Sequence, residues 1–270
     1  MASENEPTAP PGINTNVPSP ARVYDYWLGG KDNFAVDREA AEAFIKVFPG
    51  IITGVRMNRA FLGRAVAYLV GEGVRQFLDI GTGLPTADNT HEVAQRLAPE
   101  SRVVYVDNDP VVLLHAASLM TSSPEGASDY IQADLREPDT ILEAAARTLD
   151  FSRPVVVSLL QILQFVPDEA NPWGLIRTIM QPLPSGSYLV VSQPTLDVMG
   201  DTISDAADTY NSRLPDNQTT VRTRAEILRF FDSLELVEPG LVELQQWRPG
   251  PGVKPADNQI PALAGVGKKP

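Results

Sequence analysis

The stretch from residue 75 to residue 90 reads RQFLDIGTGLPTADNT, and it limits the possible folds more than any other part of the chain. Residues 76–80 are a short, mostly apolar run, which is typical of a buried parallel strand. Gly81 and Gly83 come directly after it, and from Pro85 the spacing of apolar residues becomes helical. A strand, a glycine turn and a helix N-terminus leave bare backbone against which a ligand can lie. The stretch therefore predicts a ligand-binding turn after the first strand, although such glycines can also serve only to turn the chain.

Two further predicted strands also end in a carboxylate. Asp107 comes after the apolar run 102–106, and Asp134 comes after a short run at 130–133. Because the C-terminal ends of parallel strands share one edge of a sheet, these groups should lie near the glycine turn. A carboxylate at Asp107 can accept hydrogen bonds from both ribose hydroxyls of a nucleoside, and Asp134 can accept from an adenine amine. The alternative is that Asp107 only caps the next helix.

The order of the elements predicts an α/β fold with a doubly wound, mostly parallel sheet, because strands and helices alternate from residue 75 onward. Runs 234–244 and 260–266 have no helix between them, so we expect them to pair antiparallel. We predict a disordered tail at 1–18, a helical cap at 19–72 and a cofactor-binding domain at 73–270. The three cap helices are expected near 20–28, 36–47 and 56–70, either as a lid or as plain packing.

Composition excludes several classes of function. The formal net charge is −12 and the sequence pI is about 4.6, so a nucleic-acid backbone would be repelled. The chain has no cysteine, which excludes disulfides and thiolate-bound metals, and His91 and His115 resemble ordinary helix-surface or boundary residues more than metal ligands. We expect no metal site, no signal peptide, no membrane span and a cytoplasmic location.

The choice of nucleoside cofactor depends on the residues after the two glycines. A dinucleotide site favours G-x-G-x-x-G, but the third glycine position is Thr86 here. No tyrosine has a lysine four residues later, so the Tyr/Lys pair of short-chain dehydrogenases is missing too. S-adenosylmethionine fits these features better than NAD(P), and an antiparallel end to the sheet agrees with that choice.

Five stretches of the sequence resemble class I S-adenosylmethionine-dependent methyltransferases, and more closely an actinobacterial family long catalogued as a domain of unknown function. The stretches are PSPARVYDYWLGGKDNF (18–34), NRAFLGRAV (58–66), FLDIGTGLPTADNTHEVAQ (77–95), VYVDNDP (104–110) and AGVGKKP (264–270). The resemblance implies a Rossmann-like sheet of seven strands whose last strand is antiparallel, under an N-terminal helical cap. It also implies a set of cofactor-binding residues: Asp79, Gly81, Thr82 and Gly83 in the glycine-rich loop, Asp107 and Asn108 at the ribose, and Asp134 and Leu135 at the adenine.

Two departures from the family pattern affect the chemistry. Pro85 replaces the usual third glycine of the loop, and Gln164 stands where relatives tend to have histidine, which removes a general base after the fourth strand. The catalytic candidates are therefore Asp25, Tyr24 and Gln164.

Weaker candidates surround this set. Tyr26 and Gln161 are also expected near the pocket, and Arg59 could meet a carboxylate of cofactor or substrate or form only a surface ion pair. Asp25 could instead pair with Arg22 on the same predicted helix.

We predict methyl transfer from S-adenosylmethionine. The expectation that the acceptor is a small molecule is based on the acidic surface and the possible lid. A non-catalytic S-adenosylmethionine sensor or partner-binding protein is the alternative, and an NAD(P)-dependent oxidoreductase is a further one. The sequence indicates neither the acceptor nor the oligomeric state.

Overall fold

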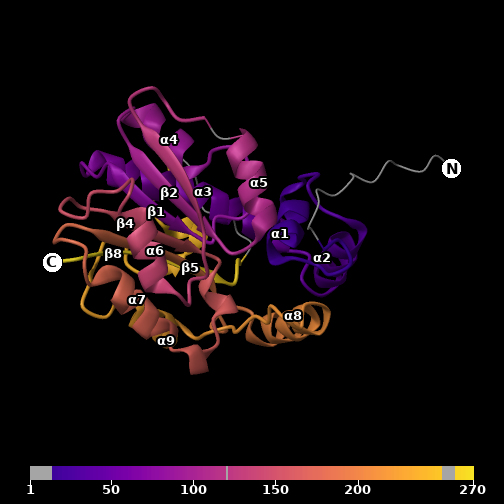
Figure 1. The fold of residues 1–270 in the computed structure, drawn as a ribbon. Helices are drawn as coiled ribbons and strands as arrows, with labels where there is room; N and C mark the ends of the chain where they lie inside the picture. The colour runs from indigo at the N-terminus through magenta and orange to yellow at the C-terminus, as the bar shows by residue number, and fades with distance from the viewer. Residues whose placement is uncertain (1–13, 120, 251–258) are drawn as a thin grey trace.

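The computed structural model describes residues 14–119, 121–250 and 259–270, and a mostly parallel sheet runs through its centre (Figure 1). The strand order is β3-β2-β1-β4-β5-β8-β6, with β7 also paired to β8. The strands are β1 (Gln76–Ile80), β2 (Arg102–Asp107), β3 (Ala127–Gln132), β4 (Val156–Leu160), β5 (Tyr188–Pro194), β6 (Glu235–Leu236), β7 (Val242–Glu243) and β8 (Ala262–Lys268). Strands β1 to β5 are parallel, whereas β8 runs antiparallel to β5, β6 and β7. The predicted doubly wound, mostly parallel sheet with an antiparallel last strand is confirmed.

The outer edge beyond β8 differs from the prediction of one strand over 234–244. Two strands of two residues each, β6 and β7, pair with β8 there, so the sheet has eight strands instead of seven. Pro239 lies between them, and the Gly240 N–H donates to the Val237 carbonyl at 2.8 Å in a turn. Proline has no N–H for a ladder, which explains why the strand is interrupted at this point. The predicted antiparallel pairing with the last strand is confirmed.

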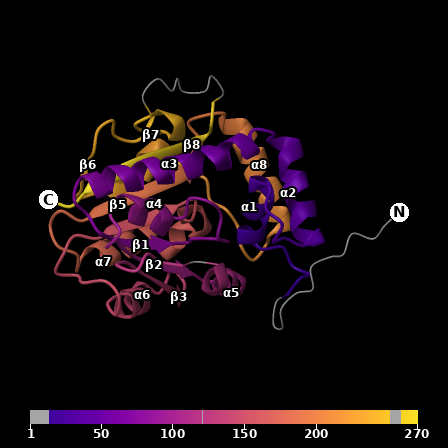
Figure 2. The same ribbon diagram turned by 90° about the horizontal axis from the view of Figure 1, so that it is seen from above.

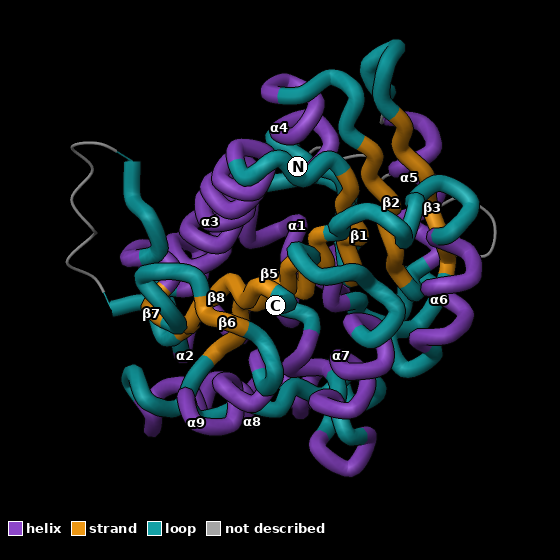
Figure 3. The backbone as a smooth tube through the Cα atoms, turned by 90° about the vertical axis from the view of Figure 1, so that its left-hand side faces the viewer, coloured by secondary structure: helices purple, strands orange, loops and turns teal. Residues whose placement is uncertain are grey.

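Helices cover both faces of the sheet. They are α1 (Pro20–Leu28), α2 (Ala35–Val47), α3 (Ile51–Gly71), α4 (Thr90–Leu97), α5 (Pro110–Leu119), α6 (Pro138–Ala145), α7 (Pro172–Met180), α8 (Gly200–Arg213) and α9 (Arg224–Leu228), with short 3-10 turns at Leu163–Phe165, Asp168–Ala170, Arg229–Phe231 and Leu244–Gln246. Figures 2 and 3 show α3 on one side of the sheet and α6 and α7 on the other.

Alternating side chains along the strands build a core on each face. Leu78 of β1 packs with residues of α6 and α7, whereas its neighbour Phe77 packs with α3 and α4. Both side chains are fully buried. A strand turns successive side chains to opposite faces, so a short apolar run is enough to hold helices on both sides.

The helical N-terminal region is present, but its three helices do not all pack in the same place. Helices α1 and α2 pack with α8 at one end of the molecule, where Val23, Ala41 and Tyr210 share one apolar cluster (Figure 2). The first turns of α3 belong to the same cluster through Val55. The rest of α3 runs along the sheet, where Phe61 lies in the core with Phe77. Part of the predicted cap therefore belongs to the helical layer of the sheet. Of the predicted tail 1–18, residues 1–13 lie outside the described residues.

Two local predictions after β1 are wrong. Helix α4 begins at Thr90 and not at Pro85, because Asn89 caps it: the Asn89 N–H donates to Glu92 at 2.7 Å in a capping box. Residues 81–89 are therefore a loop. His91, expected at a helix surface or boundary, is 2% exposed, and its Nδ1 lies 2.8 Å from the Tyr105 hydroxyl.

Candidate functional site

The glycine turn after β1 is fixed to the end of β2 by backbone hydrogen bonds. The N–H groups of Gly81 and Thr82 donate to the Val106 carbonyl at 2.8 and 3.3 Å. Gly81 has φ +75° and Gly83 has φ +65°, a left-handed conformation that favours glycine. A Cβ on Gly81 would lie 2.5 Å from Ile162 Cγ1, whereas a Cβ on Gly83 would meet no atom within 4 Å. The turn is therefore tight at Gly81 and open at Gly83.

This contrast gives a testable pair of variants. Gly83→Ala should cost about 1–2 kcal/mol of stability, the scale of placing an L-residue in the left-handed region. Gly81→Ala should cost more, because its methyl group must also displace Ile162. Urea unfolding of both variants measures the difference. Equal losses would show that the Ile162 contact does not restrict this turn.

Asp107 joins the glycine turn to the start of α5. Its Oδ2 accepts from the Gly83 N–H at 2.9 Å, and its Oδ1 accepts from the Asp109 N–H at 3.0 Å. Burial raises the pKa of this carboxyl to about 6, although these backbone donors favour the charged form. Each oxygen keeps acceptor capacity for a ligand.

Asp79 lies beneath the same turn at the end of β1. Its two carboxylate oxygens accept from the hydroxyls of Thr90 at 2.6 Å and Ser158 at 2.7 Å. Burial raises the pKa of Asp79, and the two hydroxyl donors offset part of that rise. Asp79 thus ties β1 to α4 and to the neighbouring strand β4.

The groups predicted for the third strand lie beside this arrangement. Asp134 accepts from the Arg136 guanidinium at 2.6 Å and from the Asn108 side chain at 3.1 Å, and the Arg136 hydrogen bonds lower its pKa to about 2. Leu135 is 6% exposed and packs in the core with α6 and α7. Neither residue lines the large cavity beside the glycine turn, so their contact with adenine stays a prediction.

This cavity of about 670 Å³ connects the glycine turn to the N-terminal helices. Its volume is within the range of about 300–1,000 Å³ that is usual for small-molecule sites. The C-terminal ends of β1, β2, β4 and β5 open into it, and α1, α2, α3 and α8 contribute further walls. The predicted residues that line it are Tyr24, Arg59, Asp79, Gly81, Thr82, Gly83, Asp107, Asn108, Gln161 and Gln164.

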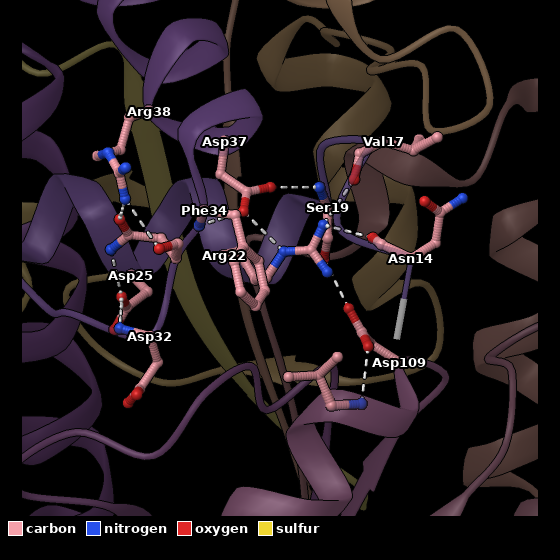
Figure 4. Close-up of polar contacts among 12 residues, drawn as sticks. Asn14, Val17, Ser19, Arg22, Asp25, Asp32, Phe34, Asp37, Arg38 and Asp109 are labelled. Atoms are coloured by element: carbon pink, nitrogen blue, oxygen red, sulfur yellow. Dashed lines mark hydrogen bonds and ion pairs between the residues drawn. The ribbon is translucent and has the colours of Figure 1, made fainter. Parts of the chain in front are cut away.

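The N-terminal helices are fastened to Asp109, just before the start of α5 (Figure 4). The Ser19 hydroxyl donates to Asp109 at 2.6 Å, and the Ser19 N–H donates to Asp37 at 2.9 Å. Arg22 and Asp37 form an ion pair at 2.8 Å in which both side chains are almost fully buried. Arg22 also donates to the Val17 carbonyl at 2.6 Å, so residues before α1 take part in this network.

The structure places two of the acid and aromatic candidates outside the cavity lining. Asp25 accepts from the Asn33 side chain at 2.8 Å and from the Asp32 N–H at 3.0 Å, and thereby holds the loop after α1 (Figure 4). It does not pair with Arg22, whose partner is Asp37. The Tyr26 hydroxyl donates to Glu42 at 2.5 Å on the exposed side of the helices. Neither Asp25 nor Tyr26 is placed to meet a ligand in this cavity.

The 161–166 segment after β4 forms another wall. Gln161 has φ +57°, a conformation that is unusual for a residue other than glycine and is found often at functional sites. The Gln164 amide nitrogen donates to the Gln161 carbonyl at 2.8 Å. The buried Oε1 of Gln164 accepts from no donor within the described residues. The buried Arg222 guanidinium donates to the carbonyls of Leu163 and Val166 at 2.8 and 2.6 Å and so fixes the segment.

The wall formed by α1, α2 and α8 is aromatic, and no pattern in the sequence predicted it. Phe44 lies 5.0 Å from Trp27 and 6.1 Å from Tyr210 between ring centroids, and Phe165 lies 6.0 Å from Tyr210. All four line the cavity. Residues 195–215 show little helical patterning in the sequence, so nothing pointed to Tyr210. Asn58 of α3 was missed as well.

Two further kinds of feature were sought in the described part of the chain. Within residues 14–119, 121–250 and 259–270, no group of three or more His, Asp or Glu side chains is arranged to hold a metal ion. In the same ranges no helix has the length and apolar character required to cross a membrane.

Comparison with known proteins gives a consistent result. Residues 6–270 match the model of a family described as S-adenosyl methyltransferase. A DUF574 family protein from Streptomyces avermitilis is 44% identical, with a TM-score of 0.89 over 95% of this chain and 99% of that one. A predicted methyltransferase from Thermobifida fusca is 41% identical, with a TM-score of 0.88 over 96% and 98%. A comparison with curated protein sequences found no match.

More distant structures share the fold. The plantazolicin methyltransferase BpumL, solved with a desmethyl substrate analogue and S-adenosylhomocysteine, has a TM-score of 0.56 at 12% identity over 93% of this chain and 96% of that one. A likeness at this level shows the fold alone. The family match, by contrast, covers both the glycine turn and the N-terminal helices. The chain belongs to the S-adenosyl methyltransferase family, and it is an S-adenosylmethionine-dependent methyltransferase.

Proposed function

We propose that this methyltransferase acts on a small-molecule acceptor held between the glycine turn and the N-terminal helices. The observation that carries the proposal is the continuous cavity, which has the glycine turn and Asp107 at one end and the aromatic wall at the other. A net charge of −12 makes nucleic acid an unfavourable acceptor. The cytoplasmic location expected from the sequence stays a prediction.

The groups at the Asp107 end have the chemistry that S-adenosylmethionine requires. We assign Asp107 to the two ribose hydroxyls, since both of its oxygens retain acceptor capacity. A Cβ at Gly83 would extend into open space in the lining, which is where a ligand can approach the backbone. Arg59 lines the cavity and donates to the carbonyls of Ala87 and Asp88, so it also holds the loop. We assign its remaining donors to the carboxylate of the cofactor.

The chain's contribution to methyl transfer is alignment and exclusion of water. S-adenosylmethionine supplies a methyl carbon already activated by its sulfonium. Burial raises the pKa of Tyr24, so its hydroxyl stays protonated at neutral pH, and the amide of Gln164 does not take up a proton. Neither residue is therefore assigned as a general base. The acceptor is then a group that reacts without losing its proton to a side chain of this wall.

A transfer experiment tests the acceptor class. The protein is incubated with S-adenosylmethionine labelled in the methyl carbon and with an extract of Streptomyces avermitilis, separated by ultrafiltration into small molecules and macromolecules. Chromatography then separates the small molecules from residual S-adenosylmethionine, and we expect label, beyond that of a control without the protein, only in these other small molecules. Label in protein or nucleic acid would overturn the proposal, and transfer to neither fraction would favour the sensor alternative over an enzyme with a small-molecule acceptor.

A thermal-shift comparison tests the site itself. S-adenosylmethionine and S-adenosylhomocysteine should stabilise the fold by about 2.7 kcal/mol at about 100 times the dissociation constant, whereas NAD and NADP should not. The glycine turn has Thr86 where a dinucleotide site has its third glycine, which is the reason for the difference. Stabilisation by a dinucleotide would contradict the assigned cofactor geometry.

A further inference from the structure

A directed chain of hydrogen bonds ends in the cavity at Tyr24. The buried Ser192 hydroxyl donates to Asn58 Oδ1 at 2.7 Å, and Asn58 Nδ2 donates to the Tyr24 hydroxyl oxygen at 3.0 Å. The amide oxygen of Asn58 thus faces Ser192, and its nitrogen faces Tyr24. The Tyr24 oxygen therefore acts as an acceptor, and its own proton must go to another group.

The described part of the protein offers that proton only a poor partner. The Val55 carbonyl lies 3.4 Å from the Tyr24 hydroxyl, beyond the usual O–H···O range of about 2.5–3.0 Å. Tyr24 and Asn58 both line the cavity, so the proton can be donated to a molecule bound there. The high pKa that burial gives Tyr24 keeps this donor protonated at neutral pH.

The surroundings of Tyr24 define the rest of the ligand. Trp27, Phe44 and Tyr210 form the aromatic cluster of this wall, and Ile51 and Ile203 add aliphatic side chains. The charged residues that line the cavity are Arg22, Arg59, Asp79, Asp107, Asp109 and Asp216.

Most of these charges are engaged away from the aromatic wall. Arg22 is paired with Asp37, and Arg59, Asp79 and Asp107 belong to the glycine-turn end. Asp109 holds Ser19 there, and Asp216 is exposed in the loop after α8. An anionic ligand at the aromatic wall would lose its hydration without finding a counter-ion.

We propose that the methyl acceptor is an aromatic molecule without anionic groups, whose oxygen or nitrogen lone pair accepts a hydrogen bond from the Tyr24 hydroxyl. This inference rests on the proposed function, because it names the substrate class for the same cavity. Tyr24 is thus a specificity-determining residue that recognises the substrate, and Asn58 and Ser192 are positioning residues that act through it.

The test uses two probes of nearly the same shape, quinoline and naphthalene, of which only quinoline has a ring nitrogen lone pair. Both are titrated by calorimetry into protein saturated with S-adenosylhomocysteine. Tyr24→Phe removes only the hydroxyl, so the dissociation constant of quinoline should rise by about 3- to 10-fold, the scale of one neutral hydrogen bond. That of naphthalene should not change. The charged analogue 2-naphthoate should bind more weakly than either.

Tyr26→Phe is the matched control, since it makes the same change two residues along α1, where the hydroxyl donates to Glu42 outside the cavity. It should leave both probes unaffected. S-adenosylhomocysteine affinity should be unchanged in both variants, whereas Tyr24→Phe should lower the melting temperature slightly, because Asn58 loses its acceptor. The proposal is overturned if Tyr24→Phe leaves the affinity for quinoline unchanged, if it weakens naphthalene binding as much as quinoline binding, or if neither probe binds. These results do not depend on transfer, so label found in macromolecules would refute the proposed function separately.

Discussion

Alanine in place of Asp107 should weaken binding of S-adenosylmethionine by about 1–3 kcal/mol, or about 5- to 150-fold in the dissociation constant. The change removes a charged acceptor that lies between the glycine turn and α5 and that we assign to the ribose hydroxyls. Calorimetric titration of the variant and the wild type measures the loss. Unchanged affinity would remove Asp107 from the site.

The pH dependence of binding separates this role from a structural one. The ribose hydroxyls donate to the carboxylate, so only the ionised form of Asp107 binds well. With a pKa of about 6 in the free protein, lowering the pH from 7.5 to 5 should weaken binding by about tenfold. Asp107→Asn cannot titrate and should lose that part of the pH dependence. If the asparagine variant has the same pH profile as wild type, another group is responsible.

Asp37→Ala should destabilise the fold by about 3–5 kcal/mol, the usual loss when one partner of a buried ion pair is removed. Asp37 is 0% exposed and Arg22 is 3% exposed, so the remaining cation would be buried without its anion. The N–H groups of Ser19 and Phe34 would also lose the acceptor that holds the start of α1 and α2. Urea unfolding followed by circular dichroism measures the loss.

An exposed ion pair supplies the comparison. Arg96 and Asp88 lie 2.6 Å apart, but their side chains are 62% and 65% exposed. Arg96→Ala should therefore cost less than about 1 kcal/mol. A second comparison, Asp37→Leu combined with Arg22→Met, should recover part of the loss, because no unpaired charge remains. An Asp37→Ala loss as small as that of Arg96→Ala would show that the buried pair does not hold the N-terminal helices.

The meeting of the glycine turn and Asp107 at one edge of the sheet could be predicted from sequence because its signals are local. The run 76–80, Gly81, Gly83 and Asp107 are each recognisable from their immediate neighbours, and parallel strands bring their ends to one edge whatever the loops do. The helix start was missed because Pro85 suits a first helical position, whereas the Asn89 capping box decides where the helix begins.

The acceptor end depends on contacts between distant elements, which one sequence does not reveal. Tyr210 reaches the cavity only because α8 packs on α2, and residues 195–215 have no pattern that predicts this packing. Asp25 was expected near the pocket, but in the structure it accepts a hydrogen bond from Asn33 in the loop after α1. Tyr24 and Asp25 are adjacent in sequence, but only Tyr24 lines the cavity, because a helix separates neighbouring side chains by about 100°.

The divided outer edge of the sheet has a consequence for self-association. A long, flat edge strand presents a row of unpaired N–H and C=O groups on which another chain can add, and this is a common start of aggregation. Here β8 is covered by two strands of two residues each, separated by the turn at Pro239 and Gly240. So short and interrupted a ladder is a poor template for a foreign strand. This edge should therefore recruit no second chain, even in concentrated solution.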